Sequence, residues 1–217
     1  MEWLKKISNK FRGSEFSPRK QYGNQLVLQP RCYIPPSEES KTWYDFTFSM
    51  AMHESSDNYR AKNRYGYLGR YQFGLARLTD LGMCERIQGS RGFSNKSFRW
   101  CTDKGFSETL FLSSHALQDE IFALHVGMHR KYILRRYVDH IGHRVNGVEI
   151  SLSGAIACFH LLGHGGFKHF LQGEDTSDAN GTMASDYIED FANYLIPSSL
   201  PISPKNVDLK RYCENIS

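Results

Sequence analysis

The feature that most constrains the fold of this 217-residue chain is a helical pattern that stops at a short polar run. The polar run, residues 55–58, reads Ser-Ser-Asp-Asn and is typical of a helix end, so Glu54 is predicted in the last helical turn. Apolar residues recur before it at i, i+4, i+7 and i+8, which predicts one buried helix face: Tyr44, Phe48, Ala51 and Met52.

The position of Glu54 favours an unusual state of its carboxyl group. The C-terminal end of a helix carries partial negative charge, which disfavours ionisation of a carboxyl there. Burial under nearby aromatic rings raises the pKa in the same direction, and four aromatic residues follow closely: Tyr65, Tyr67, Tyr71 and Phe73. A carboxyl that stays protonated near neutral pH can donate its proton to a leaving glycosidic oxygen. The alternative is an exposed helix-end residue, which is the usual position of a glutamate.

A family resemblance bears on this choice. Seven positions resemble the catalytic signature of the soluble lytic transglycosylases, peptidoglycan-cleaving enzymes of the lysozyme superfamily: Glu54, Ser55, Asn58, Ala61, Gly66, Gly69 and Gln72. Residues 66–74, Gly-Tyr-Leu-Gly-Arg-Tyr-Gln-Phe-Gly, are most similar to a bacterial and phage-associated branch of lysozyme-like proteins. The resemblance implies a mainly α, lysozyme-like fold in which Glu54 is the single general acid/base. It also implies a sugar-binding groove with these substrate-binding candidates: Ser55, Asn63, Gly69, Tyr71, Gln72, His160 and Tyr187.

Two elements further along the chain resemble the same proteins. Residues 100–105 resemble a Trp-x-x-x-Lys-Gly element, and residues 157–163 resemble an Ala-Tyr-Asn-Ala-Gly element in which Phe159 replaces the Tyr and His160 the Asn. Whether His160 takes over the substrate contact of that Asn is open. Tyr187 lies where transglycosylases carry a Tyr near the catalytic Glu. It is expected to orient Glu54, to contact an acetamido group, or to be a core tyrosine.

The chain divides into three parts by composition. Residues 1–42 form a basic amphipathic segment and a proline-containing connector, residues 43–196 the lysozyme-like domain, and residues 197–217 a tail. Within the domain we expect a long inserted loop at residues 84–113 and a small β-hairpin at Asn146-Gly147. The remaining elements are predicted helices. The first is closed by Gly82, the second runs from Ser113 or Ser114 to about Val138, and the third runs from Ser151 to Gly163. The last helix is capped by Thr182 or Ser185, and its apolar face consists of Tyr187, Ile188, Phe191 and Leu195.

The charge distribution points away from nucleic acid. Residues 1–20 hold six basic and two acidic residues, which is the whole formal excess of +4, so the remainder is near neutral. Residues 1–12 are expected to dock on the domain or to make weak contact with a membrane surface. No run of about 18 apolar residues and no secretory signal is visible, so we expect synthesis in the cytoplasm. The resemblance then implies delivery to the periplasm or cell wall, with an immunity protein or a secretion-system component as partner.

Cysteines and histidines do not predict a metal site or a cofactor. Five cysteines without paired spacing indicate neither a disulfide framework nor a zinc module, although a bridge between Cys84 and Cys101 is left open. His125 and His129 have i, i+4 spacing, as do His160 and His164, but no Glu lies between them as in a metalloprotease.

The expected reaction is cleavage between N-acetylmuramic acid and N-acetylglucosamine in peptidoglycan, by an antibacterial secreted effector or a phage-type lysin. Asn63 stands where phage lysozymes place an Asp, which favours a lytic transglycosylase over a hydrolase. A hydrolase would need a second carboxylate, and three are available: Asp57, Asp80 and Asp103. The alternatives are a catalytically inactive cell-wall-binding or structural protein, and a chitinase-like glycosidase.

Overall fold

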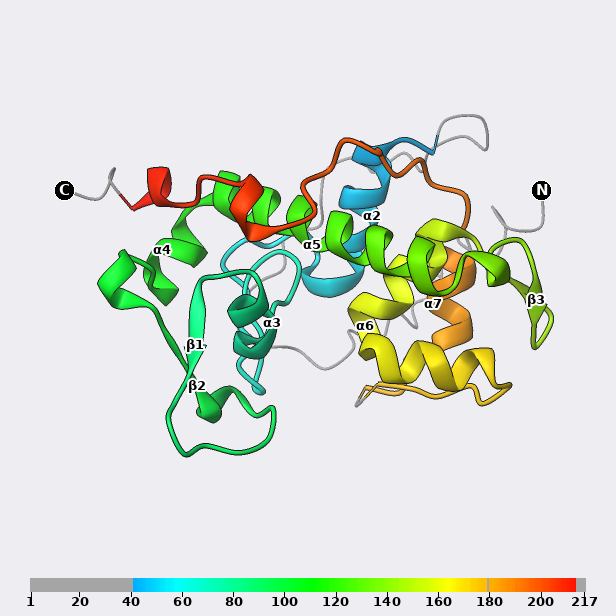
Figure 1. Cartoon of the computed structure of the whole chain (residues 1–217), viewed down its shortest axis with the longest axis horizontal. Coiled ribbons are helices and arrows are strands. Elements are labelled where there is room, and N and C mark those ends of the chain that lie inside the picture. Colours follow the sequence, from blue (N-terminus) through cyan, green and yellow to red (C-terminus); the bar gives the residue numbers. More distant parts are fainter. Residues whose placement is uncertain (1–40, 179, 214–217) are drawn as a thin grey trace, which may run out of the picture.

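The computed structural model describes residues 41–178 and 180–213, and it is mainly helical as the sequence predicts. The predicted N-terminal amphipathic helix lies outside the described residues. Figure 1 shows one long helix, α5, crossing the molecule, with α3, β1, β2 and α4 towards one end and α6 and α7 towards the other. The principal helices are α2 (Trp43–Ser55), α3 (Leu75–Asp80), α4 (Glu108–Ser113), α5 (His115–Arg136), α6 (Leu152–Leu171) and α7 (Ala184–Asp190).

The core forms around α5 because one face of this helix is apolar along its length. Ser114 caps its N-terminus by accepting a hydrogen bond from the backbone of Leu117. Leu117, Ile121 and Ile133 are fully buried. The two histidine pairs of the sequence lie on this helix and on α6, which packs against it.

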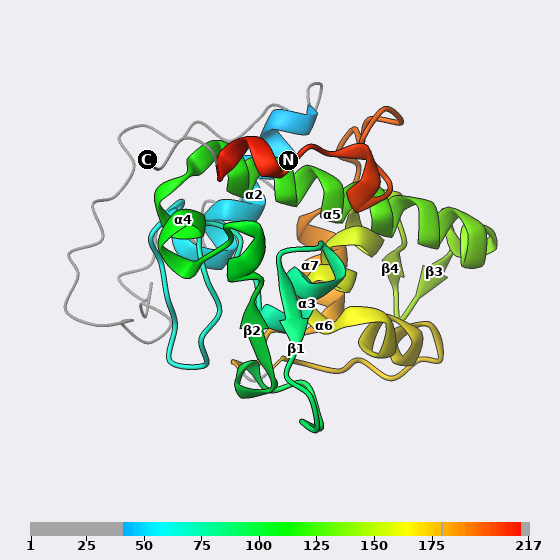
Figure 2. The same ribbon diagram turned by 60° about the vertical axis from the view of Figure 1, so that its left-hand side comes forward.

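Two small antiparallel hairpins complete the domain, and Figure 2 shows them at separate places. β1 (Cys84–Arg86) pairs with β2 (Phe98–Trp100), and β3 (Arg144–Val145) pairs with β4 (Val148–Glu149). The second hairpin turns at Asn146-Gly147, which confirms the prediction, because both residues adopt the positive φ that this turn requires. The prediction of a long inserted loop at residues 84–113 is wrong in detail, because this segment contains regular elements. It contains β1, β2, α4 and the 3₁₀ turns Asn95–Ser97 and Thr102–Lys104.

Helix boundaries and buried faces differ from the predictions at three places. Tyr44 is 70% exposed, and the buried face of α2 is instead centred on Phe46 and Met50, which pack toward α5 and α7. Leu195 is also 70% exposed because α7 ends at Asp190. Gly163 leaves the helical conformation, with φ 67° and ψ −171°, so the first helical segment of α6 ends there as predicted, but a second segment follows the kink and continues to Leu171.

The C-terminal segment packs on the domain over its described part. Pro201 lies so close to Gly127 of α5 that a Cβ there would be 2.1 Å from its carbonyl oxygen, which only glycine permits. The Tyr212 hydroxyl donates to Glu120 of α5 at 2.6 Å. Figure 1 shows this segment running along α5, so residues 197–213, predicted as a tail, contribute to the fold. In the described ranges, no helix combines the length and apolar character that crossing a membrane requires.

Candidate active site around Glu54

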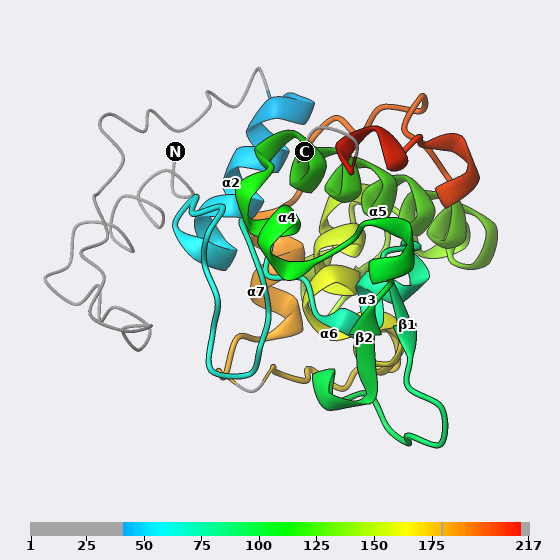
Figure 3. The same cartoon turned by 90° about the vertical axis from the view of Figure 1, so that its left-hand side faces the viewer.

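Glu54 lies at the end of α2, where the chain reverses direction. Ser56 takes a left-handed conformation, and the backbone N–H groups of Ser56 and Asp57 donate to the carbonyls of Met52 and Ala51. This Schellman-type end confirms the predicted helix stop. In Figure 3 the loop of residues 56–74 extends from the lower end of α2, and α7 lies below that end of the helix.

The Glu54 carboxyl is largely withdrawn from water. Its side chain is 15% exposed, and its Oε1 accepts a 2.7 Å hydrogen bond from the Tyr187 hydroxyl. Burial raises the pKa of Glu54 from 4.5 to about 7, the charge of Asp178 adds to this rise, and the Tyr187 hydrogen bond opposes it. The carboxyl is therefore half protonated near neutral pH, the state required of a general acid.

Tyr187 is brought to Glu54 by α7. Its side chain is 4% exposed and packs with Phe191 and the ring of His53. Neither Thr182 nor Ser185 caps α7 as predicted. Asp175 instead accepts hydrogen bonds from the Ser185 backbone N–H at 3.0 Å and from its hydroxyl at 2.5 Å, which fixes the start of the helix. Two of the expected roles of Tyr187 agree with the structure, because it contacts Glu54 and is also a buried core tyrosine whose hydroxyl is hydrogen-bonded.

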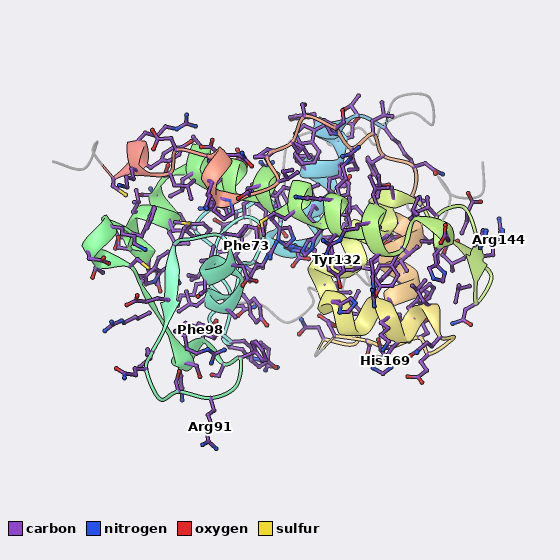
Figure 4. The ribbon with its side chains drawn as sticks, in the orientation of Figure 1. Phe73, Arg91, Phe98, Tyr132, Arg144 and His169 are labelled. Atoms are coloured by element: carbon purple, nitrogen blue, oxygen red, sulfur yellow. The ribbon has the colours of Figure 1, made fainter. Side chains whose placement is uncertain are left out.

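His160 also reaches Glu54, whereas its neighbour Phe159 lies in the core. The His160 Nε2 is 3.7 Å from Glu54 Oε1 and 3.0 Å from the backbone carbonyl oxygen of Tyr71. Its Nδ1 is 3.0 Å from His125 Nε2. Burial lowers the pKa of His160 to about 4, so the imidazole is neutral when Glu54 titrates. Figure 4 shows Phe73 near the middle of the molecule, and its ring lies edge-on to His125 and His160.

The glycine-containing loop after α2 is held next to the end of that helix by hydrogen bonds to its backbone carbonyl groups. Ser55 next to Glu54 donates from its hydroxyl to the carbonyl oxygen of Arg70 at 2.7 Å. Gly69 is buried, and a Cβ there would lie 2.2 Å from the Gln118 side-chain oxygen, so only glycine fits. Gln72 has φ 49°, and its amide donates to the carbonyl oxygen of Gly69 at 2.9 Å. Ser55, Gly69 and Gln72 thus shape this loop through contacts within the protein.

A buried arginine ties the same loop to α5. Arg70 donates to Asp57 at 2.6 Å and to Asp119 at 2.9 Å, and its side chain is 10% exposed. The hydroxyls of Tyr59 and Tyr71 donate to Asp119 at 2.8 and 2.9 Å. We name these five residues the Arg70 cluster. Tyr71 was expected among the substrate contacts, but it is 1% exposed and packs in this cluster.

The four aromatic residues that were expected to bury Glu54 are dispersed in the structure, two on an exposed turn and two in the core. Tyr65 and Tyr67 are 45% and 44% exposed, on a turn closed by Asn63, whose side-chain oxygen accepts from both of their backbone N–H groups. Asn63 therefore has a turn-forming role in this structure. Tyr71 and Phe73 lie in the core, so the hydroxyl next to Glu54 comes from the distant Tyr187.

Asp178 is the candidate second carboxylate whose charge affects Glu54, whereas the three aspartates expected from the sequence lie in other surroundings. Asp57 belongs to the Arg70 cluster, Asp80 pairs with Arg77, and Asp103 lies exposed in a 3₁₀ turn. Asp178 lies close enough for its charge to raise the pKa of Glu54. Its Oδ1 accepts from the backbone N–H groups of Asn180 and Thr182 at 2.9 and 2.8 Å.

The described residues show neither a cluster of metal ligands nor a disulfide. Within residues 41–178 and 180–213, no three His, Cys, Asp or Glu side chains converge in a manner suited to a metal ion. His164 is hydrogen-bonded to the Tyr137 hydroxyl. Cys84, Cys101, Cys158 and Cys213 are free thiols, so Cys84 and Cys101 form no bridge, and Cys32 lies outside the described residues.

Comparison of the chain with protein-family models, curated proteins and solved structures gave no match. The geometry of the site combines a carboxyl with a pKa near 7, one hydroxyl donor and one neutral imidazole.

Proposed function

We propose that this protein is a lysozyme-like glycosidase that cleaves the glycan strand of peptidoglycan, with Glu54 as its general acid and base. The observation that carries the proposal is the buried carboxyl at the end of α2, whose pKa of about 7 keeps a large protonated fraction at neutral pH. The sequence signature at residues 54–72 supports the same assignment. Peptidoglycan as substrate rests on that signature alone.

The contacts of Glu54 suggest which oxygen carries the proton. Oε1 accepts from Tyr187 and is also the oxygen nearer His160, so the transferable proton belongs on Oε2. In the proposed reaction this proton passes to the glycosidic oxygen as the bond to the muramyl carbon breaks. Glu54, now a carboxylate, then takes a proton from the nucleophile and returns to its starting state.

The identity of the nucleophile distinguishes the two mechanisms. In a lytic transglycosylase it is the 6-hydroxyl of the same muramyl residue, which reacts without a second carboxylate because the attack is intramolecular. In a hydrolase it is water, which in the inverting mechanism needs a carboxylate roughly 6.5–9.5 Å from the acid. We favour the first route, because Asp57 is held by Arg70 and Asn63 by its own turn. Asp178 is then the carboxylate to test for the second.

The experiment is digestion of purified sacculi, followed by mass analysis of the released muropeptides. The proposal expects 1,6-anhydro products, which are lighter than hydrolysed ones by one water. Reducing-end products would instead identify a hydrolase, and Asp178→Asn would then have to lose activity while Asp103→Asn keeps it. No release by the wild type, with retained binding to sacculi, would support a cell-wall-binding protein. Cleavage of chitin oligomers in preference to sacculi would support a chitinase-like enzyme.

We also propose that the protein acts in the periplasm or at the cell wall after delivery, as an antibacterial effector or a lysin. Expression in a bacterial host with an added export signal is expected to lyse the cells, and expression without it to be tolerated. Glu54→Gln removes the acid while keeping the side-chain shape, so the exported variant should be tolerated. Lysis by exported Glu54→Gln would contradict the proposal. A protective immunity protein should suppress lysis by the exported wild type.

A further inference from the structure

A chain of hydrogen bonds lies behind Glu54 that neither the sequence signature nor the proposed reaction explains. It runs from Arg77 on α3 through His125 on α5 to His160 on α6. We propose that Arg77 and His125 hold the His160 imidazole as a neutral Nε2–H donor that stabilises Glu54 once this residue has become a carboxylate. The inference rests on the proposed function, in which Glu54 gives up a proton in every turnover.

The two ends of the chain fix the position of every proton in it. Arg77 Nε can only donate, so His125 Nδ1, 2.8 Å away, is the acceptor and the His125 proton is on Nε2. That proton points at His160 Nδ1, 3.0 Å away, which must also be an acceptor. The His160 proton is therefore on Nε2, where the carbonyl oxygen of Tyr71 accepts it at 3.0 Å. A donor-only group at one end and an acceptor-only group at the other allow one arrangement.

The surroundings of the chain favour neutral imidazoles. His125 is 3% exposed and the His160 side chain 6%. Burial and the nearby guanidinium of Arg77 lower the pKa of both, and His129, whose ring lies next to His125, is affected in the same way. The charged groups facing the chain are thus Arg77 from α3 and Glu54 from α2. Asp80 contacts Arg77 at its exposed end, 3.2 Å from Nη1.

The position of Arg77 is not explained by ion pairing alone. Its partner Asp80 is 62% exposed, and an exposed i,i+3 pair of this kind contributes little to stability. Its Nη2 is buried without a hydrogen-bond partner among the described residues. The hydrogen bond to His125 is its shortest contact, so the guanidinium is placed as a donor to the chain.

The carboxylate form of Glu54 creates the need for this donor. A buried carboxylate is stabilised mainly by hydrogen bonds, and Tyr187 supplies one to Oε1. His160 Nε2 lies 3.7 Å from the same oxygen, so a small shift away from the Tyr71 carbonyl would bring its proton within hydrogen-bond distance. His160 gains and loses no proton in this role, and acts through Glu54 as a positioning residue.

The first test uses the wild-type chain labelled with ¹⁵N-histidine and measures long-range ¹H–¹⁵N correlations. The expected result is that His125 and His160 both stay neutral with the proton on Nε2 between pH 5.5 and pH 8. A proton on Nδ1 of either ring, or an imidazolium of His160 at pH 6, would overturn the inference. This measurement needs no substrate, so it stands even if the protein cleaves no glycan.

The second test compares two substitutions of similar size at His125. His125→Gln keeps an N–H donor toward His160, whereas His125→Met keeps the volume and removes the donor. With soluble glycan fragments we expect kcat to fall about tenfold in the Met variant and at most about threefold in the Gln variant, with KM unchanged in both. The basic limb of the pH–rate profile should move to higher pH in the Met variant alone, because loss of a donor raises the pKa of Glu54.

Equal losses in the two folded variants would indicate a packing role and overturn the inference while leaving the proposed function intact. If the wild type is inactive, titration of the ¹³C-labelled Glu54 carboxyl in the same three proteins replaces the rate. A Glu54 pKa that is the same in the wild type, His125→Gln and His125→Met would then overturn the inference. If His125→Met fails to fold, Arg77→Met tests the Arg77 end of the hydrogen-bond chain, with Asp80→Asn as its control. Only Arg77→Met should raise the pKa of His125, because it removes the nearby guanidinium.

Discussion

The Arg70 cluster and the Glu54 site lie next to each other and are connected by the same loop, but they provide opposite environments for their carboxyl groups. Asp57 and Asp119 share the guanidinium of Arg70, and Asp119 also accepts hydrogen bonds from the hydroxyls of Tyr59 and Tyr71, so both carboxylates are stabilised in their charged form. Among the described residues, Glu54 is paired with no Lys or Arg side chain, and it has one hydroxyl donor and a neutral imidazole 3.7 Å away. The two regions are joined through Ser55, whose hydroxyl donates to the Arg70 carbonyl oxygen.

One short loop therefore contributes both to the stability of the fold and to the geometry of the Glu54 site. The charged network holds the loop on α5, so the position of Glu54 does not depend on contacts made by Glu54 itself. The carboxyl is then free to stay in an environment that disfavours its charge. Perturbing the two regions separately should therefore change different properties, stability in one and activity in the other.

The largest expected effect is the loss of activity in Glu54→Gln. The amide keeps the shape of the side chain and can accept the Tyr187 hydrogen bond, but it cannot donate the catalytic proton. We expect cleavage of sacculi to fall by about 10²–10⁴-fold, measured as released muropeptides. Glu85→Gln, an exposed glutamate paired with Arg99, is the control and should keep wild-type activity. Cleavage by Glu54→Gln at a near wild-type rate would remove Glu54 from the mechanism.

The same substitution should stabilise the protein at high pH. Because the pKa of Glu54 is about 7 in the folded state and 4.5 in the reference state, the folded state binds more protons between these values. Wild-type stability is therefore lost as pH rises through this window, by on the order of 3 kcal/mol. Glu54→Gln avoids this loss, so its advantage in free energy of unfolding should appear at pH 8 and vanish near pH 4.5. An advantage that is equal at both pH values would show that Glu54 is not destabilised by its charge.

In the Arg70 cluster the expected effect is on stability. Arg70→Met leaves two carboxylates without their cation, and since these are 30% and 43% exposed we expect a loss of about 2 kcal/mol, less than for a fully buried pair. Arg99→Met, which breaks the exposed pair with Glu85, should cost at most about 0.5–1 kcal/mol. Denaturant unfolding measures both. If Arg70→Met proves no more destabilising than Arg99→Met, the cluster does not hold the loop.

The smallest expected effect comes from Tyr187→Phe. Removing the hydroxyl takes away a donor that lowers the pKa of Glu54, so the pKa should rise above about 7 and the basic limb of the pH–rate profile should move to higher pH. We expect a rate loss of about tenfold at neutral pH, the value of one hydrogen bond to a charged group. Tyr194→Phe is the matched control, since this buried tyrosine is hydrogen-bonded to Ser49. A profile that shifts equally in both variants would indicate a general packing effect.

Features fixed by neighbouring residues could be predicted from the sequence. The end of α2 follows from the residue 55–58 run, and the β3–β4 turn from Asn146-Gly147, because both depend on local backbone preferences. The contact between Tyr187 and Glu54 was one of the expected roles only through the family resemblance.

Contacts between distant segments could not be predicted in this way. The Arg70 cluster, the Arg77–His125–His160 chain and the charge of Asp178 bring together residues whose spacing along the chain carries no signal. The i, i+4 spacing of the histidines on α5 and α6 gave no indication that His125 and His160 contact each other. Tyr44 was placed in the core because aromatic residues were counted without knowing which face of α2 meets α5 and α7.

The most direct test of the central claim is to titrate the Glu54 carboxyl itself, by ¹³C NMR of glutamate-labelled protein with Glu54→Gln to assign the signal. The account predicts a midpoint of about pH 7, coinciding with the basic limb of the rate of sacculus cleavage. A midpoint near 4.5, or a basic limb that does not follow the titration, would contradict the assignment of Glu54 as a buried general acid.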